Sequence, residues 1–207
     1  MDDFFEYMDK NKIEKLEEEV RKLHLEPKQE NHSVIKKDVT ETFRLFWGLH
    51  LKPVIDHSKE LAKKYNANLE IVWLSAIFHD IARLEDLEPH DEVSSERAYK
   101  ILLDKEFDEK IAEEVKKTIL THRCRNYIPQ TLEQKILATA DAVNHFKAPF
   151  YLWFSWISTK SFKEQLESGL KKLERDYHEK IFFEEERESV KKEHDILKSW
   201  FNYYLKI

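Results

Sequence analysis

The sequence predicts an all-α fold, and three observations support this. The chain of 207 residues contains 2 Gly and 5 Pro, whereas sheets joined by tight turns usually need more glycine. Charged residues make up 37% of the chain, and the many Lys and Glu residues among them are good helix formers. Apolar residues recur at spacings of three and four, which is the pattern of a helix with one buried face.

The chain is long enough for one domain with a sizeable core, and no Gly-, Pro- or Ser-rich linker marks a second. We expect an N-terminal helix within residues 1–30 and a core domain over 31–148. A C-terminal helical extension over 149–207 is expected to pack on the same domain.

Composition narrows the classes of partner. The net charge of −6 and a pI of about 6.0 argue against a strongly electropositive surface for nucleic acids and favour a small ligand. Cys124 is the single cysteine, which excludes an internal disulfide framework and a cysteine-rich zinc site. The sequence has neither a signal segment nor the run of about 20 apolar residues that a membrane span requires. We expect a cytoplasmic protein without membrane partners.

The N-terminal part of the chain predicts three helices. The first carries an apolar stripe that ends before Pro27. The second is expected to run from about residue 34 to a break at Gly48, and the third to begin near Leu51, so that His50 lies at a helix start. His57 lies about 10 Å further along the helix axis and could not share an ion with His50. We interpret His57 as an ordinary helix-face histidine.

Asn68 is expected to cap the next helix, which is apolar nearly all round and therefore buried. This helix is expected to hold the adjacent residues His79 and Asp80 and to end by about Leu84. His90 then opens a further helix.

Two more helices complete the predicted core. Asp108 is expected to cap one that ends at His122, and Thr131 with Gln134 forms a capping box that opens the other. Histidines at helix ends beside loops suit a binding site, although they also occur there as partners of the helix dipole.

The C-terminal extension begins with the aromatic run 150–157, which is too short to span a bilayer. We expect this run in the core or in a subunit contact, so the oligomeric state stays open. Helices are expected around 162–177 and 190–204, and the acidic stretch 184–188 on a solvated face.

Two carboxylates lie in apolar sequence surroundings. Asp80 follows His79 within the apolar run 71–83, and Asp141 stands inside an apolar helix segment. A buried carboxylate costs several kcal/mol unless a charge or hydrogen bonds compensate it. Taken alone, the His-Asp pair is more simply a satisfied core histidine beside a helix-end carboxylate. The second carboxylate and His50 favour a bound cation instead.

Four residues from three predicted helices share nitrogen or oxygen donor atoms, and they form a metal-ligand set: His50, His79, Asp80 and Asp141. Donors of this kind without thiolate suit Mn, Fe, Co, Ni, Mg or catalytic Zn rather than structural zinc. Four protein ligands leave two positions of an octahedral ion open, as metal-assisted hydrolysis needs. His90 and His122 would extend the set to a second ion.

The ordered pattern of a histidine, a His-Asp pair and a distant aspartate resembles the HD-domain superfamily of metal-dependent phosphohydrolases. The resemblance covers about residues 43–146. It implies an HD-domain helical bundle as the core, with extra N- and C-terminal helices. It also implies which residues bind the metal: His50, His79, Asp80 and Asp141. His90 and His122 match positions that are ligands only in two-metal members and otherwise face the substrate.

The sequence departs from the family pattern at three places. Ala82 replaces a glycine common after His-Asp-Ile, and Asn144-His145 replaces a frequent later aspartate. Arg83 stands where deoxynucleotide 5′-nucleotidases and stringent-response hydrolases of the family use a glutamate. These departures count against those two specialisations.

We expect a hydrolase of phosphate esters or anhydrides that acts on a nucleotide or another small phosphorylated compound through a metal-activated water. One divalent ion per chain is expected, or two if the extra histidines are ligands. Asp80 would orient the water or accept its proton, while Arg83, His122 and Arg123 would hold phosphate oxygens. Surface ion pairing is the alternative role for both arginines.

Two rival functions remain. A di-iron oxygenase, which the superfamily also contains, would need His90 and His122 as true ligands of a second metal ion. A non-catalytic metal or nucleotide sensor would not need an intact ligand set, which this sequence has.

Overall fold

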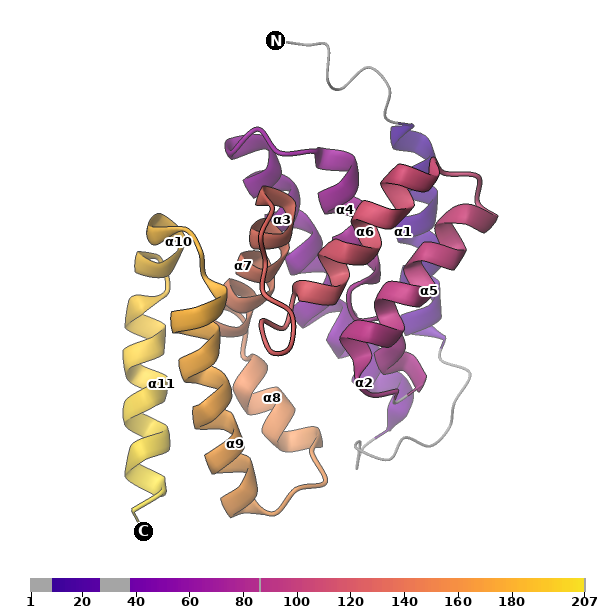
Figure 1. The fold of residues 1–207 in the computed structure, drawn as a ribbon. Coiled ribbons are helices and arrows are strands. Elements are labelled where there is room, and N and C mark those ends of the chain that lie inside the picture. Colours follow the sequence, from indigo (N-terminus) through magenta and orange to yellow (C-terminus); the bar gives the residue numbers. More distant parts are fainter. Residues whose placement is uncertain (1–8, 27–37, 86, 207) are drawn as a thin grey trace.

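The computed structural model describes residues 9–26, 38–85 and 87–206, and within these ranges it contains no strand. The all-α prediction is confirmed (Figure 1). The α-helices are α1 Lys10–Leu25, α2 Val39–Phe46, α3 Lys52–Lys64, α4 Leu69–Phe78, α5 His90–Asp104, α6 Glu109–Thr121, α7 Leu132–Lys147, α8 Phe150–Ile157, α9 Phe162–Arg175, α10 Glu184–Glu188 and α11 Lys191–Tyr204. Two π-helical turns, η1 Trp47–Leu51 and η3 Asp176–Lys180, and the 3-10 turn η2 Ile81–Glu85 connect some of them. No helix within the described ranges is long and apolar enough to cross a membrane.

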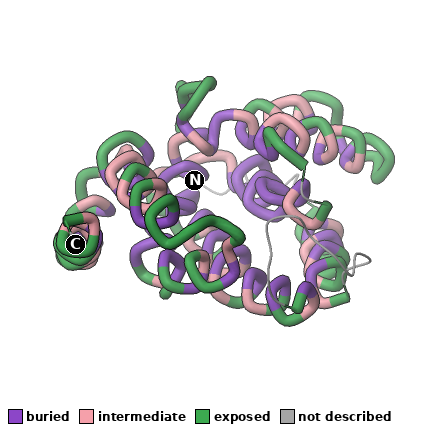
Figure 2. The backbone as a smooth tube through the Cα atoms, turned by 90° about the horizontal axis from the view of Figure 1, so that it is seen from below, coloured by how far each residue is buried: buried purple, intermediate pink, exposed green. Residues whose placement is uncertain are grey.

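The helices form two groups that α7 joins. Helices α1 to α7 make a bundle whose hydrophobic core also includes Phe150, Trp153 and Ile157 of α8, while α9 and α11 extend from one end of it (Figure 1). A second, smaller hydrophobic cluster packs the C-terminal half of α7 against α9, η3 and α11. Figure 2 shows the buried stretches in the interior and the C-terminal end of α11 exposed. The site residues described below lie where the two groups meet.

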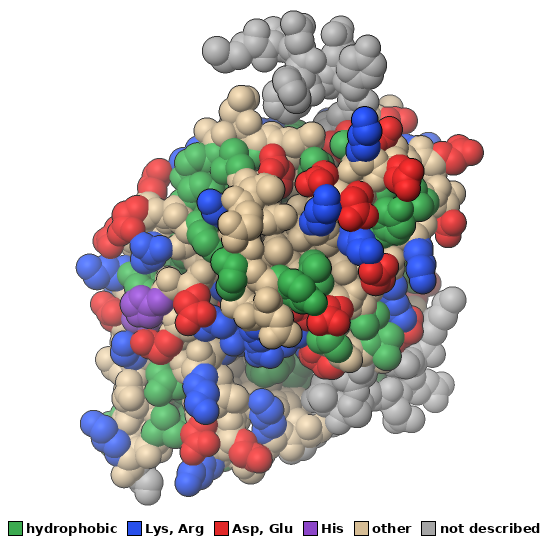
Figure 3. Space-filling view, in the orientation of Figure 1, with side chains coloured by type: hydrophobic (Ala, Val, Ile, Leu, Met, Phe, Trp, Pro, Cys, Tyr) green, Lys and Arg blue, Asp and Glu red, His purple; other side chains and the backbone are tan. Residues whose placement is uncertain are grey.

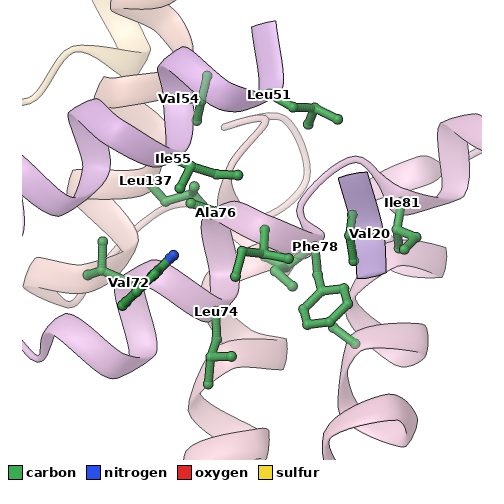
Figure 4. Close-up of a cluster of buried hydrophobic side chains, with 14 of the residues drawn as sticks. Val20, Leu51, Val54, Ile55, Val72, Leu74, Ala76, Phe78, Ile81 and Leu137 are labelled. Atoms are coloured by element: carbon green, nitrogen blue, oxygen red, sulfur yellow. The ribbon is translucent and has the colours of Figure 1, made fainter. Parts of the chain in front are cut away.

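Helix α4 is the buried centre of the bundle. Asn68 caps it by accepting a hydrogen bond from the Ile71 amide, as predicted, and every residue from Leu69 to Phe78 except Glu70 is buried. Figure 4 shows its apolar side chains packed among those of the neighbouring helices. The α-helix ends at Phe78, within the predicted limit of about Leu84, but His79 and Asp80 follow the buried helix directly and do not lie inside it as predicted.

The predicted break at Gly48 is wrong. Helices α2 and α3 are continuous through the π-helical turn η1, in which the Lys52 amide donates to the Trp47 carbonyl oxygen, five residues earlier. His50 therefore lies inside a π turn and not at a helix start. A π turn inserts one extra residue into the helical ladder, which redirects a side chain without ending the helix, and such turns are frequent at functional sites.

The other predicted helix starts agree with the structure. Asp108 caps α6, and Thr131 with Gln134 forms the capping box of α7. Helix α1 packs on the bundle, where the Trp73 indole N–H donates to Glu17 Oε2 at 2.7 Å. Residues 27–37, which include the predicted start of the second helix, lie outside the described ranges.

The acidic stretch 184–188 is not wholly solvated, contrary to the prediction. Glu186 is buried and accepts hydrogen bonds from His57 Nε2 at 3.1 Å and Lys64 Nζ at 3.3 Å. His57 therefore has a structural partner far along the chain and is not part of the predicted metal site.

His24 on α1 gives the fold a pH dependence. It is fully buried among the rings of Phe43, Phe46 and Trp47, and its Nδ1 donates to the Val20 carbonyl oxygen. Burial lowers the pKa of His24 from 6.5 to about 4. The unfolded chain therefore binds a proton between these values that the folded chain does not. This contribution to stability is present above pH 6.5 and is lost as the pH falls toward 4.

We expect the free energy of unfolding to fall by about 2 to 3 kcal/mol more in the wild type than in His24→Leu between pH 7.5 and 4.5. Urea unfolding of both proteins at the two pH values measures the difference. The other buried histidines are present in both proteins, so their contributions to the pH dependence cancel in the difference between the two unfolding free energies. Parallel pH curves would show that His24 is not buried in its neutral form.

Candidate metal centre

The six residues predicted as metal ligands meet in one buried place. They come from η1, the end of α4, the first residue of α5, the C-cap of α6 and the middle of α7. Their donor atoms fall into two groups within which all atoms lie within 4.8 Å of one another: His50, His79 and Asp141, and Asp80, His90 and His122. Their role as metal ligands stays a prediction, but the sequence spacing identified a real cluster.

Asp80 belongs to the second group and also contacts the first. Its Oδ2 is 3.6 Å from His50 Nε2, and its Oδ1 is 3.3 Å from His90 Nε2 and 3.7 Å from His122 Nε2. Burial alone would raise the pKa of Asp80, but the neighbouring His79 and His90 imidazoles hold it well below its usual range. Asp80 is thus an ionised carboxylate that faces both groups.

The protonation state of the imidazoles follows from their hydrogen bonds. Nδ1 of His79 lies 2.9 Å from the Ala76 carbonyl oxygen, and Nδ1 of His122 lies 2.6 Å from that of Ile119. Because a carbonyl oxygen only accepts, each Nδ1 carries the proton. Burial also lowers the pKa of both side chains, which keeps them neutral. The Nε2 lone pairs therefore point into the site, as metal ligation requires.

His50 follows the same rule, because its Nδ1 lies 2.9 Å from the side-chain oxygen of Asn144. Its Nε2 and that of His79 are 3.4 Å apart, so two lone pairs face each other. In addition, Asp80 Oδ1 is buried without a hydrogen-bond donor among the described residues. Facing lone pairs and an orphaned carboxylate oxygen are unfavourable unless a cation lies between them. The donor set thus fits a divalent ion.

Asp141 is more fully compensated than we expected. The C-terminal extension supplies the buried Lys180, whose Nζ donates to Asp141 Oδ2. Burial raises the pKa of Asp141, but Lys180 and then the neighbouring histidines hold it well below its usual range. Its Oδ1 faces His50 Nε2 at 3.4 Å and remains available to an ion.

The sequence reasoning missed a buried network behind Asp141. His145 lies one turn after Asp141 on α7, with its Nε2 3.3 Å from Asp141 Oδ1. Its Nδ1 donates to Asp176 Oδ2 at 2.8 Å, and the same oxygen accepts from Lys172 Nζ at 2.8 Å and Tyr151 OH at 3.0 Å. Burial, and then Lys172, lower the pKa of His145 to about 3.

One signal in the sequence could have revealed part of this network. Residues 172, 176 and 180 alternate Lys, Asp and Lys at spacings of four, which places opposite charges on one helix face. Without the fold, such a pattern is indistinguishable from a solvated salt-bridged face.

The site opens into a cavity of about 420 Å³. Ligands of both groups reach it, together with the network residues and a wall of aromatic rings from α2 and α8: Phe46, Phe150, Trp153 and Phe154. A cavity of this size with an apolar wall and convergent polar groups is typical of small-molecule sites.

Arg83 and Arg123 line the cavity and also form ion pairs, while their role in binding phosphate stays a prediction. Arg83 Nη1 lies 3.3 Å from Glu88 Oε1, and its Nε is 3.9 Å from Asp80 Oδ1. Arg123 Nη1 pairs with Glu88 at 3.1 Å and with Asp91 at 2.9 Å.

Residues 48–144 match the family model of the HD domain, which confirms the resemblance drawn from the ordered histidine and aspartate pattern. The fold is also similar to the crystal structure of a predicted HD superfamily hydrolase from an uncultured Thermotogales bacterium. The two chains are 21% identical with a TM-score of 0.53, and the match covers 93% of this chain and 91% of that one. At this identity the similarity shows the fold alone. Comparison with curated proteins gives no match.

Proposed function

We propose that this protein is a metal-dependent phosphohydrolase that acts on a phosphate ester or anhydride of a small compound, with a nucleotide as the leading candidate. The observation that carries the proposal is that the Nε2 atoms of His90 and His122 approach the orphaned Oδ1 of Asp80, and that all three residues line an open cavity. The match to the HD domain supports a metal-dependent hydrolase in general. The aromatic wall of the cavity suits a nucleobase, because aromatic rings stack on bases of any sequence.

A divalent ion held by His50, His79, Asp80 and Asp141 would act as a Lewis acid and lower the pKa of a bound water. Asp80 is placed to accept a proton from the attacking water, since its Oδ1 has no hydrogen-bond donor among the described residues.

Around the reacting phosphate, Arg83 and Arg123 present guanidinium groups to the same cavity, where charge-assisted hydrogen bonds would hold phosphate oxygens. His122 Nε2 faces the site with a lone pair, so it accepts a hydrogen bond or binds a second ion; it cannot donate one in this state.

Metal-free protein loaded with Mn²⁺ is expected to hydrolyse generic phosphomonoesters or phosphodiesters, and excess chelator is expected to reduce the rate to background. The reason is that both the nucleophile and the electrophile depend on the ion. A panel of p-nitrophenyl phosphate, its diester and common nucleotides measures the activity, and restoring Mn²⁺ is the control. Turnover that persists without metal would contradict the proposal, as would a fully loaded protein inactive on the whole panel.

A di-iron oxygenase is the second candidate, and one observation favours it. His90 and His122 both face Asp80, which makes Asp80 a potential bridge between two ions. Elemental analysis showing two irons per chain, together with oxygen consumption, would favour this reading over hydrolysis.

A further inference from the structure

The cavity is also lined by cationic side chains that the proposed chemistry does not use. Arg125 follows α6, while Lys172 and Arg175 belong to α9, and all three line the cavity. We call them the cationic cluster. Figure 3 shows Lys and Arg side chains gathered in a hollow between the bundle and the C-terminal helices.

Arg175 lacks a close counter-charge. Its Nε is buried without a hydrogen-bond partner among the described residues, and its nearest ion-pair contact is Nη2 to Asp176 Oδ1 at 3.9 Å. Asp176 is already engaged on its other oxygen by Lys172 at 2.8 Å. The guanidinium of Arg175 therefore keeps most of its hydrogen-bonding capacity for another group.

Arg125 has neither a hydrogen bond nor an ion pair within the described part of the chain. Partial burial lowers the pKa of Arg125, and the positive charges of Arg123 and Arg175 lower it further. Two guanidinium groups that line one cavity, neither within hydrogen-bond distance of a carboxylate among the described residues, repel each other and favour the binding of an anion.

The arginines near the predicted metal ligands differ from this cluster. Arg83 and Arg123 are both neutralised by Glu88, and Arg123 also by Asp91. The positive charge of the cavity that lacks a close carboxylate thus lies on Arg125 and Arg175, not on Arg83 and Arg123. A substrate whose single phosphate lies at the metal site would not neutralise the positive charge of Arg125 and Arg175.

We propose that Arg125 and Arg175 form a second anion subsite, which binds a phosphate of the substrate other than the one that is hydrolysed. This inference rests on the proposed function and narrows its substrate class to compounds with at least two phosphates, such as a phosphoanhydride or a bisphosphate. The planar guanidinium group binds phosphate oxygens in a bidentate manner, which a lysine cannot do. Lys172, whose Nζ donates to Asp176 Oδ2, lines the same cavity and adds charge.

The test compares two probes that are not hydrolysed. Methylenediphosphonate has two phosphonate groups linked through carbon, and inorganic phosphate has one group. Calorimetric titration of the full-length, Mn²⁺-loaded protein measures the affinity for each. We expect Arg125→Gln and Arg175→Gln each to weaken methylenediphosphonate binding about 10- to 100-fold, and to change phosphate binding by less than about twofold.

Two further variants keep the test sharp. Arg21→Gln removes an exposed arginine that pairs with Glu18 on α1, and it should leave both affinities unchanged. Arg175→Lys keeps the positive charge but loses the bidentate guanidinium group, so it should retain part of the affinity for methylenediphosphonate. This variant also gives a result if Arg175→Gln folds poorly. Equal losses for both probes, or no loss for either, would overturn the subsite.

These binding measurements need no turnover, so they separate the two proposals. An arginine-dependent preference for methylenediphosphonate in a protein that hydrolyses no phosphate ester would keep the subsite and reject the hydrolase. Hydrolysis without that preference would keep the hydrolase and reject the subsite.

Discussion

Replacing His50 by alanine is expected to empty the metal site and to reduce hydrolysis to background, whereas His57→Ala keeps both. His50 Nε2 lies within 3.6 Å of Asp80 and 3.4 Å of both Asp141 and His79, so its loss removes a donor common to the whole set. His57 instead faces Glu186, and its loss removes only a half-buried ion pair. Elemental analysis after dialysis measures occupancy, and the phosphate-ester assay measures turnover.

His57→Ala is a matched control because both histidines lie on the same continuous helix and both substitutions remove the same imidazole group. Its effect on the unfolding free energy should be about 1 kcal/mol, the size expected for a partly exposed pair. Comparable metal occupancy in the two variants would mean that His50 is not a ligand.

Asp141→Asn is expected to weaken metal binding strongly and to abolish turnover, and also to destabilise the metal-free protein by about 3 kcal/mol. From the sequence alone we expected the metal-free protein to be unchanged or more stable, because repulsion between Asp141 and Asp80 would be relieved. The structure reverses the sign of this expected change in metal-free stability. Lys180 is buried against Asp141, and removing the carboxylate leaves that ammonium with Asp176 Oδ1, at 3.9 Å, as its one remaining ion-pair partner among the described residues.

Thermal melts with and without excess Mn²⁺ separate the two effects. A ligand raises the melting temperature only in a protein that binds it, so the metal-induced rise should be large in the wild type and small in Asp141→Asn. The double variant Asp141→Asn/Lys180→Met should recover metal-free stability without recovering the metal-induced rise. An equal rise in wild type and Asp141→Asn would rule out Asp141 as a ligand.

The features that the sequence predicted well depend on neighbouring residues. Asn68, Asp108 and the box of Thr131 and Gln134 cap helices where expected, because a cap is a contact between residues two or three positions apart. The cluster of predicted ligands was also predictable. Asp80 and Asp141 lie in apolar segments and need compensating groups, and the sequence offers few histidines that could join them at a bound cation.

The features that were missed depend on packing between distant segments. Lys180 reaches Asp141 across 39 residues, and His57 reaches Glu186 across 129. Neither pair has a local signature. The π turn around His50 was also missed, because Gly48 predicts a helix break unless the flanking helices are held in line by the core.

The HD-domain match ends at residue 144, yet Asp176 and Lys180 of η3 hold His145 and Asp141 from outside it. A fragment cut at that boundary would keep every predicted ligand and lose the ammonium that offsets one of them. The same boundary separates the helices that carry the predicted metal ligands from the C-terminal helices that line part of the cavity. Substitutions in α8 and α9 can therefore change the shape of the cavity while the helices that carry the predicted ligands stay the same. Related chains could differ in substrate specificity through changes in this extension alone.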